Sequence, residues 1–316
     1  MENRTVIITG ANSGIGKAAA IKFAKEGYHV VMACRNIERS KKAQKEVIDT
    51  SKGDQVELME LDVSSMSSIR RFCTEFKQRY EKLDILIHNA AYFNHGEKTY
   101  QFSVDQLELT FATNTFGPFL MTKLLVDHLA KSEDPRILNA CTTNIRYFFD
   151  PKRKIEFDNL QGELKDSKPY SVYINYGNSK MAFLMLTFKM ADVYEGAGIK
   201  VNAIQIPAIK VSRETIKKLS PGYRVIASLQ SFISDSQESM GDTYFHICTS
   251  DEFKEVTGKL INDKREIVIS SHYGSGVKDV IKQFFDKNVY PTYADDQEVI
   301  EKVWELSDRL TSDIAK

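Results

Sequence analysis

Short apolar runs alternate with longer amphipathic segments over the first two thirds of the chain. Runs rich in β-branched and aliphatic residues, each the length of a strand, occupy residues 6–9, 29–33, 56–61, 84–88, 136–140 and 200–204. Apolar residues recur at three- and four-residue steps, as in amphipathic helices, over residues 14–26, 38–50, 66–80, 105–131 and 176–194. Strand-then-helix repetition builds a parallel sheet covered on both faces, so the pattern predicts an α/β fold of the doubly wound type.

Three segments interrupt this alternation, and each follows the carboxyl end of a predicted strand. They are residues 92–102, 144–169 and 211–241. Open α/β sheets place their ligand crevice at this edge, so we expect these segments on the substrate side. In the third, an apolar stripe at helical spacing either lines a pocket or seals the core (Val225, Ile226, Leu229, Phe232 and Ile233).

The tail is predicted to continue the same domain. Residues 259–261 predict a seventh strand, and residues 276–286 and 297–312 predict two amphipathic helices. No low-complexity linker precedes them. We therefore expect one domain over residues 1–262, which includes the insertions 144–169 and 211–241, and a helical extension over residues 263–316 packed on it.

Composition and charge exclude several classes of partner. Among the 316 residues, 43 are basic and 43 acidic, so no net field draws the chain to nucleic acid or to an acidic membrane. The four cysteines and six histidines lack the spacing of a disulfide framework or a metal site. The start lacks the regions of a signal peptide, and no apolar run reaches the roughly 18 residues of a membrane span. We expect a soluble, cytoplasmic protein with a small-molecule partner and no metal; homo-oligomer formation stays open.

A glycine-rich loop joins the first predicted strand to the first predicted helix. It reads Thr9-Gly10-Ala11-Asn12-Ser13-Gly14-Ile15-Gly16. Residues without side chains allow a tight turn and the close approach of a phosphate, to which the helix N-terminus presents free N–H groups. A glycine-rich turn that binds nothing is the alternative. We assign the loop to the pyrophosphate of a dinucleotide, with Gly10, Asn12, Ser13, Gly14, Ile15 and Gly16 as its binding residues.

The end of the second predicted strand indicates which dinucleotide binds. An acidic residue usually accepts the ribose 2′-OH of NAD here, but the chain has Arg35 and Asn36 and no acid before Glu38. A guanidinium group can bind the 2′-phosphate of NADP through two charge-assisted hydrogen bonds. Arg35 and Asn36 therefore predict NADP(H) in preference to NAD(H); a solvated arginine at a strand end is the alternative.

A tyrosine and a lysine four residues apart supply the candidate chemistry. On a helix, Tyr176 and Lys180 share one face, so both can point into the same cleft. A free phenol titrates near pH 10, and a nearby ammonium group together with an oxidised nicotinamide can lower its pKa. Tyr176 can then donate a proton to a carbonyl oxygen or accept one from an alcohol.

Pro118 predicts a break inside the helix expected over residues 105–131. Proline has no N–H to donate to the carbonyl group four residues earlier, which belongs to Asn114. That carbonyl is left free; a merely structural kink is the alternative.

These motifs, in this order, resemble the short-chain dehydrogenase/reductase family over about residues 4–262. The shared features are the glycine loop, Leu61-Asp62-Val63, His88-Asn89-Ala90-Ala91, Asn114, a polar cluster after the fifth strand, and Tyr176 with Lys180. The resemblance implies a single Rossmann-type sheet of about seven strands, in the order 3-2-1-4-5-6-7, with helices on both faces. It also implies that the cofactor's adenine side is flanked by Asp62, Val63, Asn89, Ala90 and Ala91, that Lys180 holds the nicotinamide ribose, and that the Asn114 carbonyl holds a water molecule leading to Lys180.

Residues 33–36, 157–163 and 303–307 resemble one branch of the family, the retinol-dehydrogenase-like and WW-domain-oxidoreductase-like reductases. That branch favours NADP and apolar carbonyl or alcohol substrates. The aromatic residues of the long insertion suit a ring-bearing ligand or pack the loop onto the domain (Tyr147, Phe148, Phe149, Tyr170 and Tyr173).

The chain departs from the family pattern at three places. Thr142 stands where the family has the serine that holds the substrate oxygen, with Thr143 as the alternative in another register. A threonine hydroxyl still donates a hydrogen bond, but its methyl group narrows the site and stiffens the side chain. Ala91 replaces the usual glycine, and Pro207 comes one residue late, with Ser212 in place of the threonine that contacts the carboxamide.

The sequence thus predicts an NADP(H)-dependent oxidoreductase that interconverts a carbonyl and an alcohol. Tyr176 is its acid/base, Lys180 the electrostatic partner, Thr142 the oxygen holder and Asn114 the support of a water relay. Cofactor contacts extend to Pro207 and Ser212. The alternative is a non-catalytic NADP-binding protein that senses redox state or acts as a scaffold, because the departures modify the active site.

Overall fold

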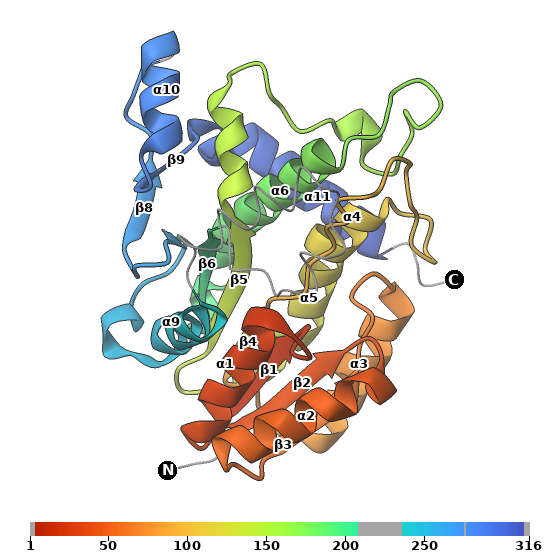
Figure 1. Cartoon of the computed structure of the whole chain (residues 1–316), viewed down its shortest axis with the longest axis vertical. Helices are drawn as coiled ribbons and strands as arrows, with labels where there is room; N and C mark the ends of the chain where they lie inside the picture. The colour runs from red at the N-terminus through yellow and green to blue at the C-terminus, as the bar shows by residue number, and fades with distance from the viewer. Residues whose placement is uncertain (1–3, 208–235, 275, 313–316) are drawn as a thin grey trace.

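Nine strands of the described chain form one sheet. The computed structural model describes residues 4–207, 236–274 and 276–312. The strand order is β3-β2-β1-β4-β5-β6-β7-β8-β9, so the predicted order 3-2-1-4-5-6-7 is confirmed and two strands extend it (Figure 1). Neighbouring strands are parallel except for the antiparallel pair β7 and β8. The strands are β1 (Thr5–Thr9), β2 (His29–Cys34), β3 (Val56–Glu60), β4 (Ile85–His88), β5 (Arg136–Thr142), β6 (Lys200–Ile206), β7 (Leu260–Ile261), β8 (Ile267–Ser270) and β9 (Val289–Tyr290).

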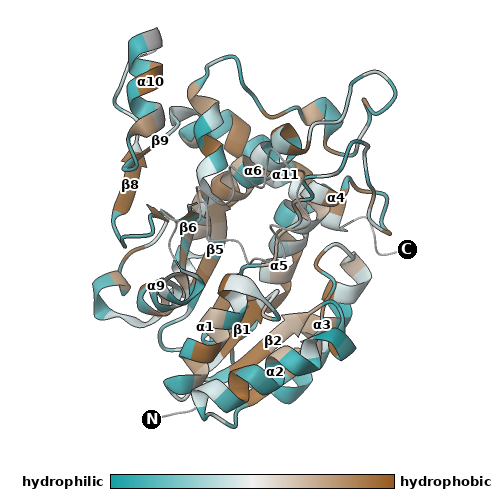
Figure 2. Ribbon diagram, viewed as in Figure 1, coloured by the Kyte–Doolittle hydropathy of each residue, from teal (hydrophilic) through white to brown (hydrophobic). Residues whose placement is uncertain are grey.

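Helices cover both faces of the sheet, as predicted. They are α1 (Gly14–Lys25), α2 (Ile37–Ser51), α3 (Met66–Arg79), α4 (Leu109–Phe111), α5 (Gly117–Leu129), α6 (Val172–Val193), α9 (Gln237–Thr249), α10 (Val277–Phe285) and α11 (Gln297–Ser312). Side chains alternate along β1, so that Val6 and Ile8 pack with α1, α2 and α9, whereas Ile7 packs with α3, α5, α6 and α11. Figure 2 shows apolar residues in the strands beneath the polar outer face of α2.

The helix predicted over residues 105–131 is interrupted near Pro118. It begins only at Leu109, because the Glu108 carboxylate caps α4 by accepting a hydrogen bond from the Phe111 N–H. A π-helical turn, η1 (Ala112–Phe116), then joins α4 to α5, and the Gly117 N–H donates to the Ala112 carbonyl five residues earlier. The wider turn accommodates the missing N–H of Pro118.

The tail contains the two predicted helices, α10 and α11, but also the strands β8 and β9, which were not predicted. Helix α11 packs on α5 and α6, whereas α10 lies beside β9 at one end of the molecule in Figure 1. Within the described residues, no helix is long and apolar enough to cross a membrane. The predicted apolar stripe of residues 225–233 and the predicted cofactor residue Ser212 lie outside the described residues.

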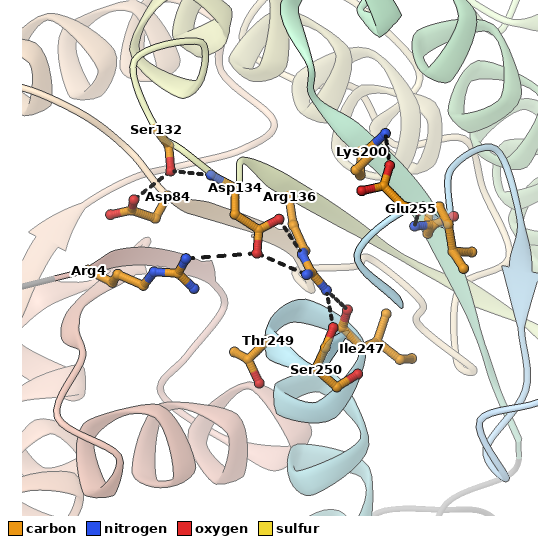
Figure 3. A network of polar contacts seen from close by, with 12 residues as sticks. Arg4, Asp84, Ser132, Asp134, Arg136, Lys200, Ile247, Thr249, Ser250 and Glu255 are labelled. Atoms are coloured by element: carbon orange, nitrogen blue, oxygen red, sulfur yellow. Dashed lines mark hydrogen bonds and ion pairs between the residues drawn. The ribbon is translucent and has the colours of Figure 1, made fainter. Parts of the chain in front are cut away.

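A buried ion pair fixes the amino end of β5. The Arg136 guanidinium is 3% exposed and donates to both carboxylate oxygens of Asp134 at 2.9 Å (Figure 3). It also donates to the Ile247 and Ser250 carbonyls at 3.1 and 3.0 Å, where α9 ends. A cation there satisfies carbonyl groups that the helix leaves without partners. Helix α9 is therefore anchored to the sheet at its C-terminus.

Candidate active site

A cleft of about 510 Å³ opens at the carboxyl ends of the strands. It brings together twelve of the residues predicted to bind a cofactor: Gly10, Asn12, Ser13, Gly14, Ile15, Arg35, Asn36, Asp62, Val63, Asn89, Ala90 and Ala91. Its volume is within the range of small-molecule and cofactor sites. The predicted ligand crevice is therefore present at this edge of the sheet.

The glycine loop takes the shape that its sequence requires. Gly10 and Gly14 have φ angles of +66° and +59°, which side chains rarely adopt. A Cβ atom on Gly16 would lie 2.5 Å from the Asn89 amide nitrogen and 2.7 Å from the Gly10 carbonyl oxygen. Gly16 does not line the cleft itself; it allows α1 to approach the loop closely.

Asn89 ties the glycine loop to β4. Its Nδ2 donates to the Thr9 carbonyl at 3.0 Å and to the Gly10 carbonyl at 3.5 Å. The backbone N–H groups of Asn89 and Ala90 both donate to the Thr9 hydroxyl at 2.9 Å. These bonds hold the first turn of the loop against the Asn89-Ala90-Ala91 turn.

Two exposed arginines line the same end of the cleft. Arg35 follows β2, and Arg39 lies in the first turns of α2. Asn36 caps that helix, because its side-chain oxygen accepts a hydrogen bond from the Arg39 N–H at 2.9 Å. Sequence reasoning missed Arg39, although a basic residue four positions after Arg35 was a readable signal.

Asp62 and Val63 line the cleft at the end of β3, the strand next to β2. The Asp62 carboxylate accepts hydrogen bonds from the Ser64 N–H at 2.9 Å and the Ser64 hydroxyl at 2.6 Å. These bonds hold the turn after β3, so its carboxylate and the apolar side chains of Leu61 and Val63 all face the cleft.

Tyr176 lies on α6 beside Thr142, the last residue of β5. The Thr142 side chain lies close enough to the phenol to lower its pKa, which opposes part of the effect of burial. Burial is the larger effect and, with the Cys141 thiol, raises the pKa of Tyr176 to about 12. The protein's own groups therefore favour the protonated phenol, and the lowered pKa predicted beside an oxidised nicotinamide stays a prediction.

Lys180 shares the helix with Tyr176 but directs its ammonium group to β5. The Nζ donates to the Ala140 carbonyl at 2.7 Å, and the side chain is 1% exposed. Burial lowers the pKa of Lys180 to about 8. Tyr176 and Lys180 therefore both face the end of β5, where the ammonium group binds a backbone carbonyl. The predicted ribose contact of Lys180 stays a prediction.

The Asn114 side chain links the π-helical turn to helix α6. Its Nδ2 donates to the Ser179 hydroxyl at 3.1 Å, and Ser179 in turn donates to the Tyr176 carbonyl at 2.9 Å. Its Oδ1 accepts a hydrogen bond from the Tyr92 N–H at 2.7 Å. The side chain of Asn114 thus positions both α6 and the loop after β4, and the predicted water on its carbonyl stays a prediction.

An aromatic side chain, Phe93, packs on the ring of Tyr176. The ring centroids of Phe93 and Tyr176 are 4.4 Å apart, and His95 and Tyr173 pack against Phe93 at 4.4 and 5.6 Å. The cleft is not lined by five of the predicted site residues: Tyr176, Thr142, Lys180, Asn114 and Pro207. Phe93 was missed by sequence reasoning, because nothing in the segment 92–102 indicates which of its residues reaches the phenol.

Other residues of the cleft were also missed. Ala33, Leu61, Tyr92, Thr113 and Ile206 line it. Ala33 is the penultimate residue of β2, Leu61 directly follows β3 and Ile206 ends β6, so the carboxyl-end rule could have named them. Thr113 depends on the π-helical turn, which the sequence does not indicate.

His88 and Cys141 are both buried. The His88 ring is 1% exposed, and its Nε2 lies 2.8 Å from the Thr122 hydroxyl. Burial, aided by the Lys180 charge, lowers the pKa of His88 to about 3. Burial raises the pKa of the Cys141 thiol to about 11, which disfavours a nucleophilic thiolate.

Comparisons with known proteins agree with these features. The family model for short chain dehydrogenases matches residues 4–148. Retinol dehydrogenase 12 from Mus musculus is 32% identical over 268 residues, 85% of this chain and 80% of that protein. Retinol dehydrogenase 13 from the same organism is 29% identical over 311 residues, 97% of this chain and 83% of that protein. A short-chain dehydrogenase structure from Shigella flexneri, complexed with NADP, has a TM-score of 0.62 at 18% identity and covers 84% of this chain and 98% of its own, a likeness of fold.

Proposed function

The chain belongs to the short-chain dehydrogenase/reductase family, in its retinol-dehydrogenase-like branch, and from this premise we propose that it is an NADP(H)-dependent enzyme interconverting a carbonyl and an alcohol. The observation that carries the proposal is the proximity of the Tyr176 phenol to the Thr142 side chain. Both hydroxyl groups can reach one oxygen atom of a substrate, which is the requirement for proton transfer to that oxygen.

The residues present fit a dinucleotide. Gly16 leaves no room for a side chain between α1 and the loop, and the cleft exposes the turn that leads into the first N–H groups of α1. Gly10, Asn12, Ser13, Gly14 and Ile15 would hold the pyrophosphate, with the adenine between Asp62, Val63 and the Asn89-Ala90-Ala91 turn. When bound, the cofactor supplies the hydride and the protein supplies position and field.

Proton transfer is the task of the protein. Thr142 donates a hydrogen bond to the carbonyl oxygen and orients it, and Tyr176 gives its proton to that oxygen during reduction. A phenol whose pKa is raised to about 12 stays protonated at neutral pH, which favours the role of proton donor. Lys180 supports the negative charge that Tyr176 then carries.

We propose NADP(H) as the cofactor because two guanidinium groups, Arg35 and Arg39, line the cleft beside Asn36. Two cations there suit a 2′-phosphate dianion far better than a ribose hydroxyl. The Shigella flexneri structure complexed with NADP is consistent with this choice.

We propose an apolar, ring-bearing substrate because Phe93 packs on the ring of Tyr176, and Tyr173 and His95 pack against Phe93. A flat conjugated ligand can replace the contact between Phe93 and Tyr176 with an equivalent one. The relatives named retinol dehydrogenases are consistent with such a substrate.

The test is turnover of a panel of aldehydes, ketones and quinones, followed by loss of NADPH absorbance. Tyr176→Phe should abolish turnover and leave the dissociation constant of NADPH within about twofold, because only the acidic hydroxyl is lost. Thr142→Ser should keep activity, and Thr142→Val should lose about 10- to 100-fold through the missing donor. Tyr194→Phe, at the far end of α6, is the control.

A Tyr176→Phe variant that retained most of its kcat would refute the assignment. NADPH binding without turnover of any member of the panel would favour the alternative, a non-catalytic NADP-binding sensor or scaffold. The packing of Phe93 on the Tyr176 ring is the observation that favours this second function.

A further inference from the structure

Tyr244 is a buried phenol that the proposed reaction does not use. It lies on α9 with no exposed surface, packed with α1 and β1 in the core on that side of the sheet. A buried tyrosine hydroxyl costs free energy unless it has a hydrogen-bond partner. The Tyr244 hydroxyl donates to the Asn89 Oδ1 at 3.3 Å.

The partner of Tyr244 is the residue that holds the glycine loop. Asn89 uses its Nδ2 to donate to Thr9 and Gly10, so its amide must keep the nitrogen toward the loop and the oxygen away from it. The two carbonyl groups set this orientation, and Tyr244 supplies a donor on the oxygen side that holds the amide in place. A flipped amide would place an acceptor against two carbonyl groups.

The position of Tyr244 is fixed by close packing of α9 on α1. A Cβ atom on Gly241 would lie 2.8 Å from the Ala18 carbonyl carbon and 2.8 Å from the Ala19 nitrogen, so the two helices are in backbone contact there. Tyr244 follows Gly241 by three residues and shares its side of the helix. Arg136 anchors the C-terminus of α9 (Figure 3). These contacts fix the position of the Tyr244 hydroxyl relative to Asn89.

We propose that Tyr244 is a positioning residue of the cofactor site: through Asn89 it holds the glycine loop in the shape that receives the pyrophosphate. The inference rests on the proposed dinucleotide function. It makes α9, whose first residues belong to the segment 211–241 predicted to lie on the substrate side, a structural support of cofactor binding. Because the pyrophosphate is common to both dinucleotides, the effect applies equally to NADPH and NADH.

The test is Tyr244→Phe, which removes one hydroxyl and keeps the ring. The dissociation constants and KM values of NADPH and NADH should rise by the same factor, about 2- to 10-fold, the effect of one neutral hydrogen bond. The kcat at saturating cofactor should change by less than about twofold, because Tyr244 acts on binding. Cys248→Ala, one turn further along α9 and equally buried, loosens the helix without touching Asn89 and should leave both dissociation constants unchanged.

A double-mutant cycle separates positioning from packing. Asn89→Ala should weaken binding, and adding Tyr244→Phe to it should weaken binding no further, because the two residues act in series. Three outcomes would overturn the inference and leave the proposed function standing. They are additive losses of affinity in the double variant, a loss in Cys248→Ala equal to that in Tyr244→Phe, and unchanged affinity in Tyr244→Phe. If the wild-type protein bound neither dinucleotide, the proposed function would fail and the inference with it.

Discussion

Arg35 and Arg39 lie on one side of the cleft, and their shared contribution to cofactor choice can be measured. Arg35→Ala should raise the dissociation constant of NADPH by about 10- to 100-fold, because a charge-assisted bond to the 2′-phosphate is lost. The dissociation constant of NADH should change by less than about twofold. Fluorescence titration with both dinucleotides checks the difference.

The matched control is Lys41→Ala, an exposed cation on the same helix that pairs with Glu38. It removes the same charge from α2 without facing the cleft, so the ratio of the two dissociation constants should stay unchanged. An equal loss of NADPH affinity in Lys41→Ala would indicate a general field effect rather than a bound phosphate.

Phe93 packs on the ring of Tyr176, so its replacement should weaken the binding of a substrate beside this phenol. Phe93→Ala should raise the KM of a ring-bearing aldehyde by about 2- to 10-fold, because an aromatic contact is lost. The KM of a small aliphatic aldehyde should change less, and Phe93→Leu should lie between. Steady-state kinetics with the two aldehydes check this; equal changes for both would contradict the role of Phe93 in recognising the ring.

At the scale of elements, the π-helical turn depends on a close approach between η1 and the loop after β3. A Cβ atom on Gly117 would lie 2.0 Å from the Val63 carbonyl oxygen, a backbone atom that cannot move aside cheaply. Gly117→Ala should therefore lower the free energy of unfolding by about 1–3 kcal/mol, as overpacking does. Because Val63 lines the cleft, the KM of NADPH should rise as well.

Urea unfolding of Gly117→Ala beside Gly196→Ala measures this effect. Gly196 has open space where its Cβ atom would lie, so its replacement should leave the midpoint almost unchanged. If both variants unfolded at the wild-type midpoint, the close contact with Val63 would not constrain the turn.

The same turn shows what local sequence can and cannot predict about an element. Pro118 indicated the break, because the missing N–H is a property of one residue. The form of the break follows from the contact between Gly117 and Val63, which belong to different elements, and the sequence does not indicate that contact. The strands β8 and β9 were missed for a similar reason: β9 has two residues, and short strands are defined by their neighbours rather than by their own pattern.

For the whole molecule, strand-helix periodicity and ordered motifs were sufficient to predict the topology and most of the cleft. The glycine loop and the residues at strand ends are predictable because the sheet brings consecutive carboxyl ends together. The positions of Lys180, Phe93 and Tyr244 are not, because each depends on how a helix or loop packs against distant residues. Side-chain direction across elements is therefore the part of the site that required the structure.

Acid stability is a whole-molecule property to which His88 makes a defined contribution. Burial lowers the pKa of His88 from 6.5 to about 3. The unfolded chain binds a proton at this side chain below about pH 6.5 and the folded chain does not, so stability falls as the pH falls from about 6.5 toward 3. Above that range His88 is neutral in both states and contributes nothing to the pH dependence.

His88→Gln should remove this contribution, because glutamine does not titrate and its amide can still pair with Thr122. Between about pH 6 and pH 4, the wild-type free energy of unfolding should fall more steeply than that of the variant, by up to about 1.4 kcal/mol per pH unit. The carboxylates titrate alike in both proteins, and Lys180, whose pKa is lowered only to about 8, stays charged throughout this range. Urea unfolding at several pH values, with the exposed His272→Gln as control, measures the difference in slope; parallel slopes for wild type and His88→Gln would mean that His88 protonates without unfolding the core around it.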